Sequence, residues 1–152
     1  MTKKSRPKTL SKRDYEALSL FRYQLRRFLR FSEKATRAEG ITPLQYQLLV
    51  HVRGFLGREW ATVGEIAERL QAQPHGVLAL IARCEANGLI RRRRSQRDRR
   101  KVEIHLRSKG ARCLRRLAAL HRAELQSLKG AIQLAGEVPN RAGITGRGRK
   151  SE

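Results

Sequence analysis

The sequence is poor in the residues that build metal sites, disulfide frameworks and membrane spans. Its 152 residues include only two cysteines, Cys84 and Cys113, and no cluster of His and Cys has the spacing of a zinc site. No apolar run reaches the roughly 18 residues of a transmembrane helix, and no apolar segment follows the basic N-terminus as it would in a secretory signal. We therefore expect no metal, no cofactor, no membrane partner and a cytoplasmic location.

The sequence also lacks the constellations that carry catalysis. It contains no nucleophile elbow, no glycine-rich phosphate-binding loop and no pair of catalytic carboxylates. Its apolar share of 39% still suffices for a core, because a chain of this length buries roughly two-thirds of its surface on folding. We expect a single compact unit that is not an enzyme.

Acidic residues are scarce as well, and basic residues are abundant. The chain has 35 Lys and Arg against 13 Asp and Glu, a formal net charge of +22. The charge is focused, since eight of the eleven residues 91–101 are basic and Asp98 is the one acid among them. A basic surface that is merely solvated has no need to concentrate its charge in one segment, whereas an array of phosphates attracts concentrated positive charge. We therefore expect double-stranded DNA as the partner and a nucleoid-associated protein.

A long helix is predicted at each end of the chain. Ser11 and Asp14 form a capping box that opens a helix over about residues 12–37, and Ser108 can cap a second helix that runs to about residue 134. The second helix carries a heptad-like seam, namely Leu114, Leu117, His121, Leu125, Leu128 and Ile132. The first has more apolar surface than one core requires, which indicates a second partner surface.

Three shorter helices and a hairpin are predicted between them. Thr42 caps a helix over residues 43–53, Thr62 caps one that ends at Leu70, and Pro74 opens one that ends at Asn87-Gly88. The third has a core face made of Val77, Leu80, Ile81 and Cys84. The arginine run and the alternating residues 101–106 form the two arms of a hairpin. This order predicts a mainly α fold with a small β-hairpin, a winged helix-turn-helix.

The chain resembles the MarR family of bacterial transcriptional regulators from about Leu10 to Leu134. The resemblance rests on NGLIRR at residues 87–92, DRR at 98–100 and LRSKG at 106–110, supported by residues 41–49 and by GEIAERL at 64–70. It implies a homodimer built from the first and last helices and binding to a palindromic operator, usually as a repressor.

The predicted organisation follows from these elements. We expect a disordered basic N-terminus over residues 1–10, dimerisation helices over 11–37 and 108–135, a winged helix-turn-helix DNA-binding domain over 38–107 and a disordered basic tail over 136–152. A symmetric dimer would place two recognition helices about one DNA turn apart.

The recognition helix and the wing supply the candidate DNA contacts. The exposed positions at the helix are Gln73, His75, Gly76, Leu78, Ala79 and Arg83. The wing contributes Arg97, Asp98, Arg99, Arg100 and Lys101, whose arginines suit a narrow minor groove. Gln73 replaces the Ser or Thr common in the family, which weakens the cap or changes the base preference. Asp98 either holds Arg100 or a strand arginine, as the resemblance implies, or is a turn residue.

The resemblance also implies release of DNA by a small aromatic acid bound between the dimer helices and the winged domain. The candidate residues are Tyr23, Arg26, Tyr46, His51 and Trp60, and the aromatic residues among them are more often part of the core than of a ligand site. Cys113 is a candidate thiol switch or an ordinary buried residue.

A second function is open at this stage. The apolar recognition helix, the net charge and the RGRK tail are also compatible with a sequence-tolerant nucleic-acid packaging or RNA-binding protein. The ratio of operator to random-DNA affinity separates the two.

Overall fold

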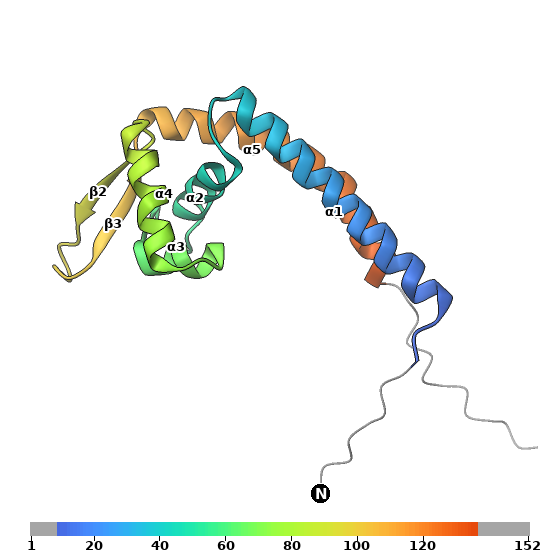
Figure 1. Cartoon of the computed structure of the whole chain (residues 1–152). Coiled ribbons are helices and arrows are strands. Elements are labelled where there is room, and N and C mark those ends of the chain that lie inside the picture. Colours follow the sequence, from blue (N-terminus) through green and yellow to red (C-terminus); the bar gives the residue numbers. More distant parts are fainter. Residues whose placement is uncertain (1–8, 137–152) are drawn as a thin grey trace, which may run out of the picture.

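The computed structural model describes residues 9–136 as five helices and a three-stranded antiparallel sheet (Figure 1). The elements in chain order are α1 (Lys12–Ala38), α2 (Pro43–Arg53), β1 (Trp60–Thr62), α3 (Val63–Leu70), α4 (Pro74–Ala86), β2 (Ile90–Arg94), β3 (Val102–Leu106) and α5 (Ser108–Gly136). The predicted mainly α winged-helix fold is confirmed. The predicted terminal segments lie almost wholly outside the described residues.

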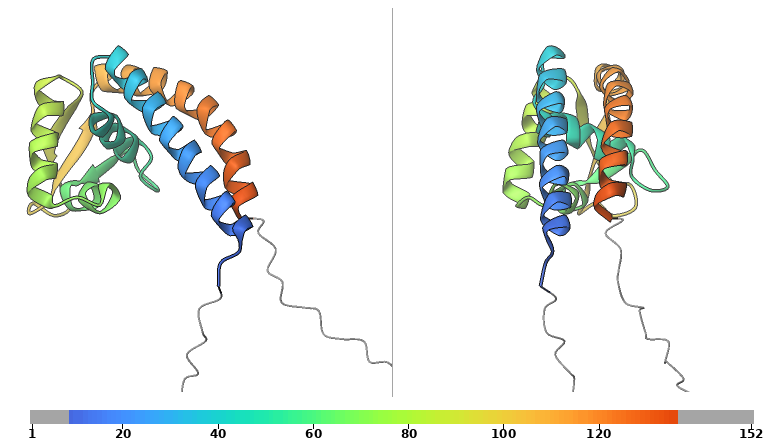
Figure 2. Two further views of the ribbon diagram at one scale, coloured as in Figure 1. Left: turned by 45° about the vertical axis from the view of Figure 1, so that its right-hand side comes forward. Right: turned by 90° about the vertical axis from the view of Figure 1, so that its right-hand side faces the viewer.

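The long helices α1 and α5 lie side by side and extend away from the rest of the molecule (Figure 2); we call this pair the stalk. The Ser11–Asp14 capping box opens α1, with the Asp14 carboxylate accepting the Ser11 backbone N–H at 2.7 Å. Helix α5 begins at Ser108 itself, whereas a helix capped by Ser108, as predicted, would begin one residue later. Its seam is buried at Leu114, Leu117, His121 and Leu128, whereas Leu125 is 47% exposed.

The remaining elements form the winged-helix unit, and their helix starts follow the predicted capping chemistry. Thr42 with Gln45 and Thr62 with Glu65 close reciprocal capping boxes at the starts of α2 and α3. Pro74 occupies the first turn of α4, and the predicted core face of that helix is buried. Because a capping side chain satisfies backbone N–H groups that the helix cannot, these starts are fixed locally.

The sheet contains one strand more than the predicted hairpin. Strands β2 and β3 pair from Ile90 opposite Leu106 to Arg94 opposite Val102, and β1 adds to the other edge of β3 through Trp60 opposite His105. The three residues of β1 are too few to display a period of two, and they run directly into the Thr62 cap. The sequence pattern therefore could not reveal this strand.

The core fills the winged-helix unit and continues into the stalk. Leu48, Leu49, Ile66, Ile81 and Leu117 are fully buried in it. Within residues 9–136 no helix combines the length and apolar character needed to cross a membrane.

Candidate nucleic-acid interface

The six positions predicted for the recognition helix and its start all face solvent. They are Gln73, His75, Gly76, Leu78, Ala79 and Arg83. Gln73 occupies the N-cap position of α4 without a side-chain hydrogen bond to the helix, so its amide is free to contact another molecule. Leu78 is 45% exposed. This face has few charged side chains that could hydrogen-bond to base edges, and Leu78 suits an apolar contact with a thymine methyl group.

The wing tip, residues 95–101, is a turn closed by its own backbone. The Ser95 N–H donates to the Lys101 carbonyl at 3.0 Å, and the Lys101 N–H donates to the Asp98 carbonyl at 2.9 Å. The hydroxyl of Ser95 is buried and accepts the N–H groups of Arg97 and Asp98 at 3.3 and 3.4 Å. The turn therefore has a defined shape, although its arginines are exposed.

Asp98 holds Arg100 through the backbone. Its Oδ1 accepts the Arg100 N–H at 3.0 Å. Among the ion pairs of residues 9–136, none joins Asp98 to an arginine side chain. Of the two sequence-based interpretations, the turn residue is the one that this contact fits. The guanidinium of Arg100 is left for another partner.

The strand arginines differ in their partners. All four side chains of residues 91–94 are exposed, and Arg92 pairs with Glu85 of α4 at 3.3 Å. Arg93 lies opposite the buried Glu103 in the sheet register. Both views in Figure 2 and that in Figure 1 place the hairpin tip and the α3–α4 turn at the end of the winged-helix unit away from the start of α5. The wing, which carries the basic residues, and the start of α4 thus lie at one end of the unit, which we call the basic end.

A chain of contacts that the sequence analysis missed joins α3 to the wing. Arg58 stacks on the Trp60 ring at 3.9 Å and on Phe55 at 4.2 Å, and it pairs with Glu65 at the start of α3. Trp60 in turn stacks on His105 of β3, with 6.1 Å between ring centroids. These contacts cross from the helix-turn-helix to the sheet.

The chain continues from β3 to the wing tip. Nε2 of His105 and the Glu103 carboxylate are 2.9 Å apart. Hydrogen bonds from His105 and Ser95 hold the pKa of the buried Glu103 carboxyl below its usual value. Because Ser95 also accepts the N–H groups of Arg97 and Asp98, the wing turn is anchored through Glu103 to the body of the domain.

The five residues predicted to bind an aromatic acid lie in separate places. Tyr23, 59% exposed, and Arg26 are on the solvent side of α1. Tyr46 is buried and stacks on His121 at 4.2 Å. Burial and the nearby Arg69 lower the pKa of the half-buried His51, and Trp60 lies beside the wing. One chain therefore does not bring these residues into one pocket.

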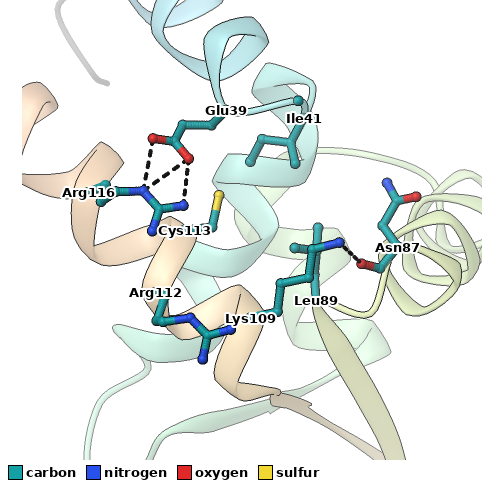
Figure 3. A pocket seen from close by; sticks show the side chains of 9 residues that line it. Glu39, Ile41, Asn87, Leu89, Lys109, Arg112, Cys113 and Arg116 are labelled. Carbon is teal, nitrogen blue, oxygen red and sulfur yellow. Dashed lines mark hydrogen bonds and ion pairs between the residues drawn. The ribbon is translucent and has the colours of Figure 1, made fainter.

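A different cavity lies where the winged-helix unit meets the stalk (Figure 3). It has a volume of about 250 Å³ and is lined by the end of α1, the α4–β2 turn and the first turns of α5. Arg116 of α5 holds Glu39 in a two-pronged ion pair, with the closest contact at 2.7 Å. Lys109 donates to the Asn87 carbonyl at 2.8 Å, and Arg112 completes the basic lining.

The two cysteines have the properties of buried core thiols. Burial raises the pKa of Cys84 to about 11, and burial together with Glu39 raises the pKa of Cys113. Both thiols are free. Because the thiolate is the reactive form, this environment disfavours the thiol switch considered for Cys113.

Comparison with known proteins gives the family. The sequence model of the MarR family matches residues 39–101, which run from the end of α1 to the wing tip. This winged-helix region matches the MarR family. Among curated proteins, no sequence matches it. The part of the MarR match that the residues had indicated, from the α2 cap to the wing motif, is therefore confirmed.

Solved MarR-type structures share the fold at low identity. AbsC, a MarR family transcriptional regulator from Streptomyces coelicolor, superposes with a TM-score of 0.68 at 21% identity, covering 83% of this chain and 84% of AbsC. A MepR variant from S. aureus, bound to an oligodeoxyribonucleotide, gives 0.60 at 22%, covering 74% and 80%. BpsR from Bordetella bronchiseptica, whose DNA binding is regulated by 6-hydroxynicotinic acid, gives 0.59 at 19%, covering 76% and 85%.

Proposed function

We propose that this protein is a DNA-binding transcriptional regulator of the MarR type, a repressor that binds a palindromic operator as a homodimer. The observation that carries the proposal is the basic end of the winged-helix unit. There the exposed face of α4 lies beside a wing tip whose arginines are exposed while its backbone is held rigid. Helix α4 would enter the major groove, and the wing would contact the neighbouring minor groove.

The stalk supports the homodimer. It exposes large apolar side chains well beyond what contact between α1 and α5 covers, namely Leu10, Tyr15, Leu18, Leu20, Leu29, Leu120 and Leu125. Many exposed large apolar side chains on one small domain are typical of an association surface. Two copies that share the stalk would present two α4 helices to one operator.

The ratio of two affinities tests the regulator against the packaging protein. We expect the operator to bind at least about 10³-fold more tightly than random DNA at physiological salt. DNA protected upstream of the protein's own gene supplies the candidate operator. Counterion release also predicts that binding weakens steeply as salt rises, for both DNAs. A ratio near one would contradict the regulator and favour sequence-tolerant packaging.

We further propose that a small aromatic acid acts as effector at the cavity of Figure 3. Three cations, Lys109, Arg112 and Arg116, face a single acid there, Glu39. An anion bound in this cavity would contact both the stalk and the α4–β2 turn, and so it could change their relative position and that of α4. BpsR provides the precedent for regulation by such an acid.

Arg112→Ala tests the effector site. With 6-hydroxynicotinic acid and benzoate as probes, we expect the variant to need at least about tenfold more probe for DNA release, because a charge-assisted contact contributes roughly 1.5–3 kcal/mol. Arg115→Ala is the matched control, since Arg115 is an exposed neighbour on α5 that does not line the cavity. Equal responses of the two variants, or no response of the wild type, would count against this site.

A further inference from the structure

The stalk carries a row of cations that the proposed operator contacts do not use. Arg22, Arg26, Arg30 and Lys34 follow one another at intervals of four residues along α1, and all four are exposed; we call them the arginine stripe. Residues four apart on a helix are neighbours one turn above another, and each step turns about 40° around the axis. The stripe therefore runs along about 18 Å of the helix axis, with a cation every 6 Å or so.

The stripe faces away from α5. Arg30 follows the half-buried Phe21 by nine residues, which is two and a half helical turns and hence the opposite face of α1. The exposed Leu18 and Leu29 lie roughly 100–120° around the helix from Arg30. A second subunit can therefore cover these leucines without covering the centre of the stripe.

The stripe has no acidic partners. No Asp or Glu occurs between Ala17 and Ser32, the segment that holds its three arginines, and among the ion pairs of residues 9–136 none involves a residue of the stripe. Like charges four residues apart repel and weaken the helix. A helix face that is only solvated normally carries both positive and negative side chains, as α1 does at Glu33 and Arg37. An uninterrupted row of cations instead fits a polyanion.

We propose that the arginine stripe binds the phosphate backbone of a second DNA duplex while the winged-helix units hold the operator. This inference rests on the proposed function, which already brings duplex DNA to the protein. The stalk extends away from the wing tip, so a straight operator that contacts the wing cannot also run along α1 (Figure 2). The protein would thus bridge two DNA segments.

The chemistry of the stripe suits a backbone and not a base sequence. A row of three guanidinium groups and one ammonium group along a helix suits the regular negative charge of a duplex, one per about 1.7 Å of its axis. Tyr23 lies within the stripe, is 59% exposed and has Arg27 over its ring at 5.9 Å. Its hydroxyl adds a neutral donor of the kind that contacts phosphate oxygens. The contact would be independent of sequence.

A capture assay tests the bridge. Full-length protein is bound to a bead-tethered operator duplex and then offered a labelled duplex of unrelated sequence. The variant carries Arg22→Gln, Arg26→Gln and Arg30→Gln, because Gln keeps the helix propensity of Arg and removes the charge. At about 0.15 M salt, the loss of three phosphate contacts corresponds to roughly 100-fold weaker capture. The slope of log binding constant against log salt concentration should also become less steep by about 2.7.

Two control variants separate the stripe from charge in general. The same three positions changed to Lys retain the charge, so we expect capture within about threefold of the wild type. Arg53→Gln, Arg69→Gln and Arg107→Gln together remove the same net charge from exposed sites outside the stalk, and we expect little loss of capture.

The outcomes separate this inference from the proposed function. Capture by the Gln variant equal to that of the wild type, or an equal loss in the second control, overturns the bridge while leaving operator binding intact. A wild type without operator preference overturns the regulator instead, and the salt slopes of the same variants on random DNA still test the stripe. If single-stranded RNA displaces the second duplex at tenfold lower concentration, the partner is RNA and the proposal of a DNA bridge is wrong.

Discussion

Replacing Arg100 with alanine is expected to abolish specific operator binding and to leave the fold intact. The guanidinium of Arg100 is exposed at the wing tip, and the contact that fixes this residue runs through its backbone N–H to Asp98. The alanine variant retains that N–H, so the turn should persist. The measurements are operator affinity at fixed salt and the midpoint of thermal unfolding.

The size of the effect follows from symmetry. A well-placed arginine contact with a groove contributes about 1–3 kcal/mol. A homodimer would lose two such contacts, roughly 2–6 kcal/mol, which is comparable with the three decades that separate operator from random DNA. Arg107→Ala removes the same charge at the other end of β3 and should change the affinity little. An Arg100→Ala protein that binds the operator like the wild type would refute the assignment of the wing.

The helices were predictable because their signals are local. A capping box such as that of Thr42 and Gln45 satisfies backbone groups within four residues, so the sequence alone contains both partners. The buried face of α4 was equally predictable, because four apolar side chains at helical spacing lie on the same side of the helix. These parts of the fold depend little on the rest of the chain.

The contacts that anchor the wing were not predictable because their partners are distant in the sequence. Trp60 meets His105 only because β1 pairs with β3, and β1 is too short to be recognised. The aromatic candidates for an effector site failed to gather for the same reason. Tyr46 turns into the core to stack on His121, a partner supplied by α5, the last helix. Tertiary packing, and not residue type, decided where these rings lie.

Gly110→Ala is expected to destabilise the protein by about 3 kcal/mol, since overpacking a tight core typically costs roughly that much. Gly110 is buried in the first turn of α5 and is the last residue of the LRSKG motif at residues 106–110. A Cβ there would overlap the carbonyl oxygen of Leu89 and lie 2.9 Å from its carbonyl carbon and 3.2 Å from Cδ2 of Leu106. Backbone atoms cannot rotate away, so α5 would have to move off the α4–β2 turn.

Gly130→Ala provides the control of opposite sign. Gly130 is also in α5, is exposed and has no atom within 4 Å of the position where its Cβ would be. Alanine there should stabilise the helix by up to about 1 kcal/mol, the difference in helix propensity between the two residues. In thermal unfolding we expect the midpoint of Gly110→Ala to fall by about 10 °C and that of Gly130→Ala to rise slightly. Since the Leu89 carbonyl also accepts the Arg107 N–H at 2.9 Å, a Gly110→Ala protein as stable as the wild type would mean that α5 does not approach the domain this closely. The coupling proposed between the stalk and α4 would then lose its structural basis.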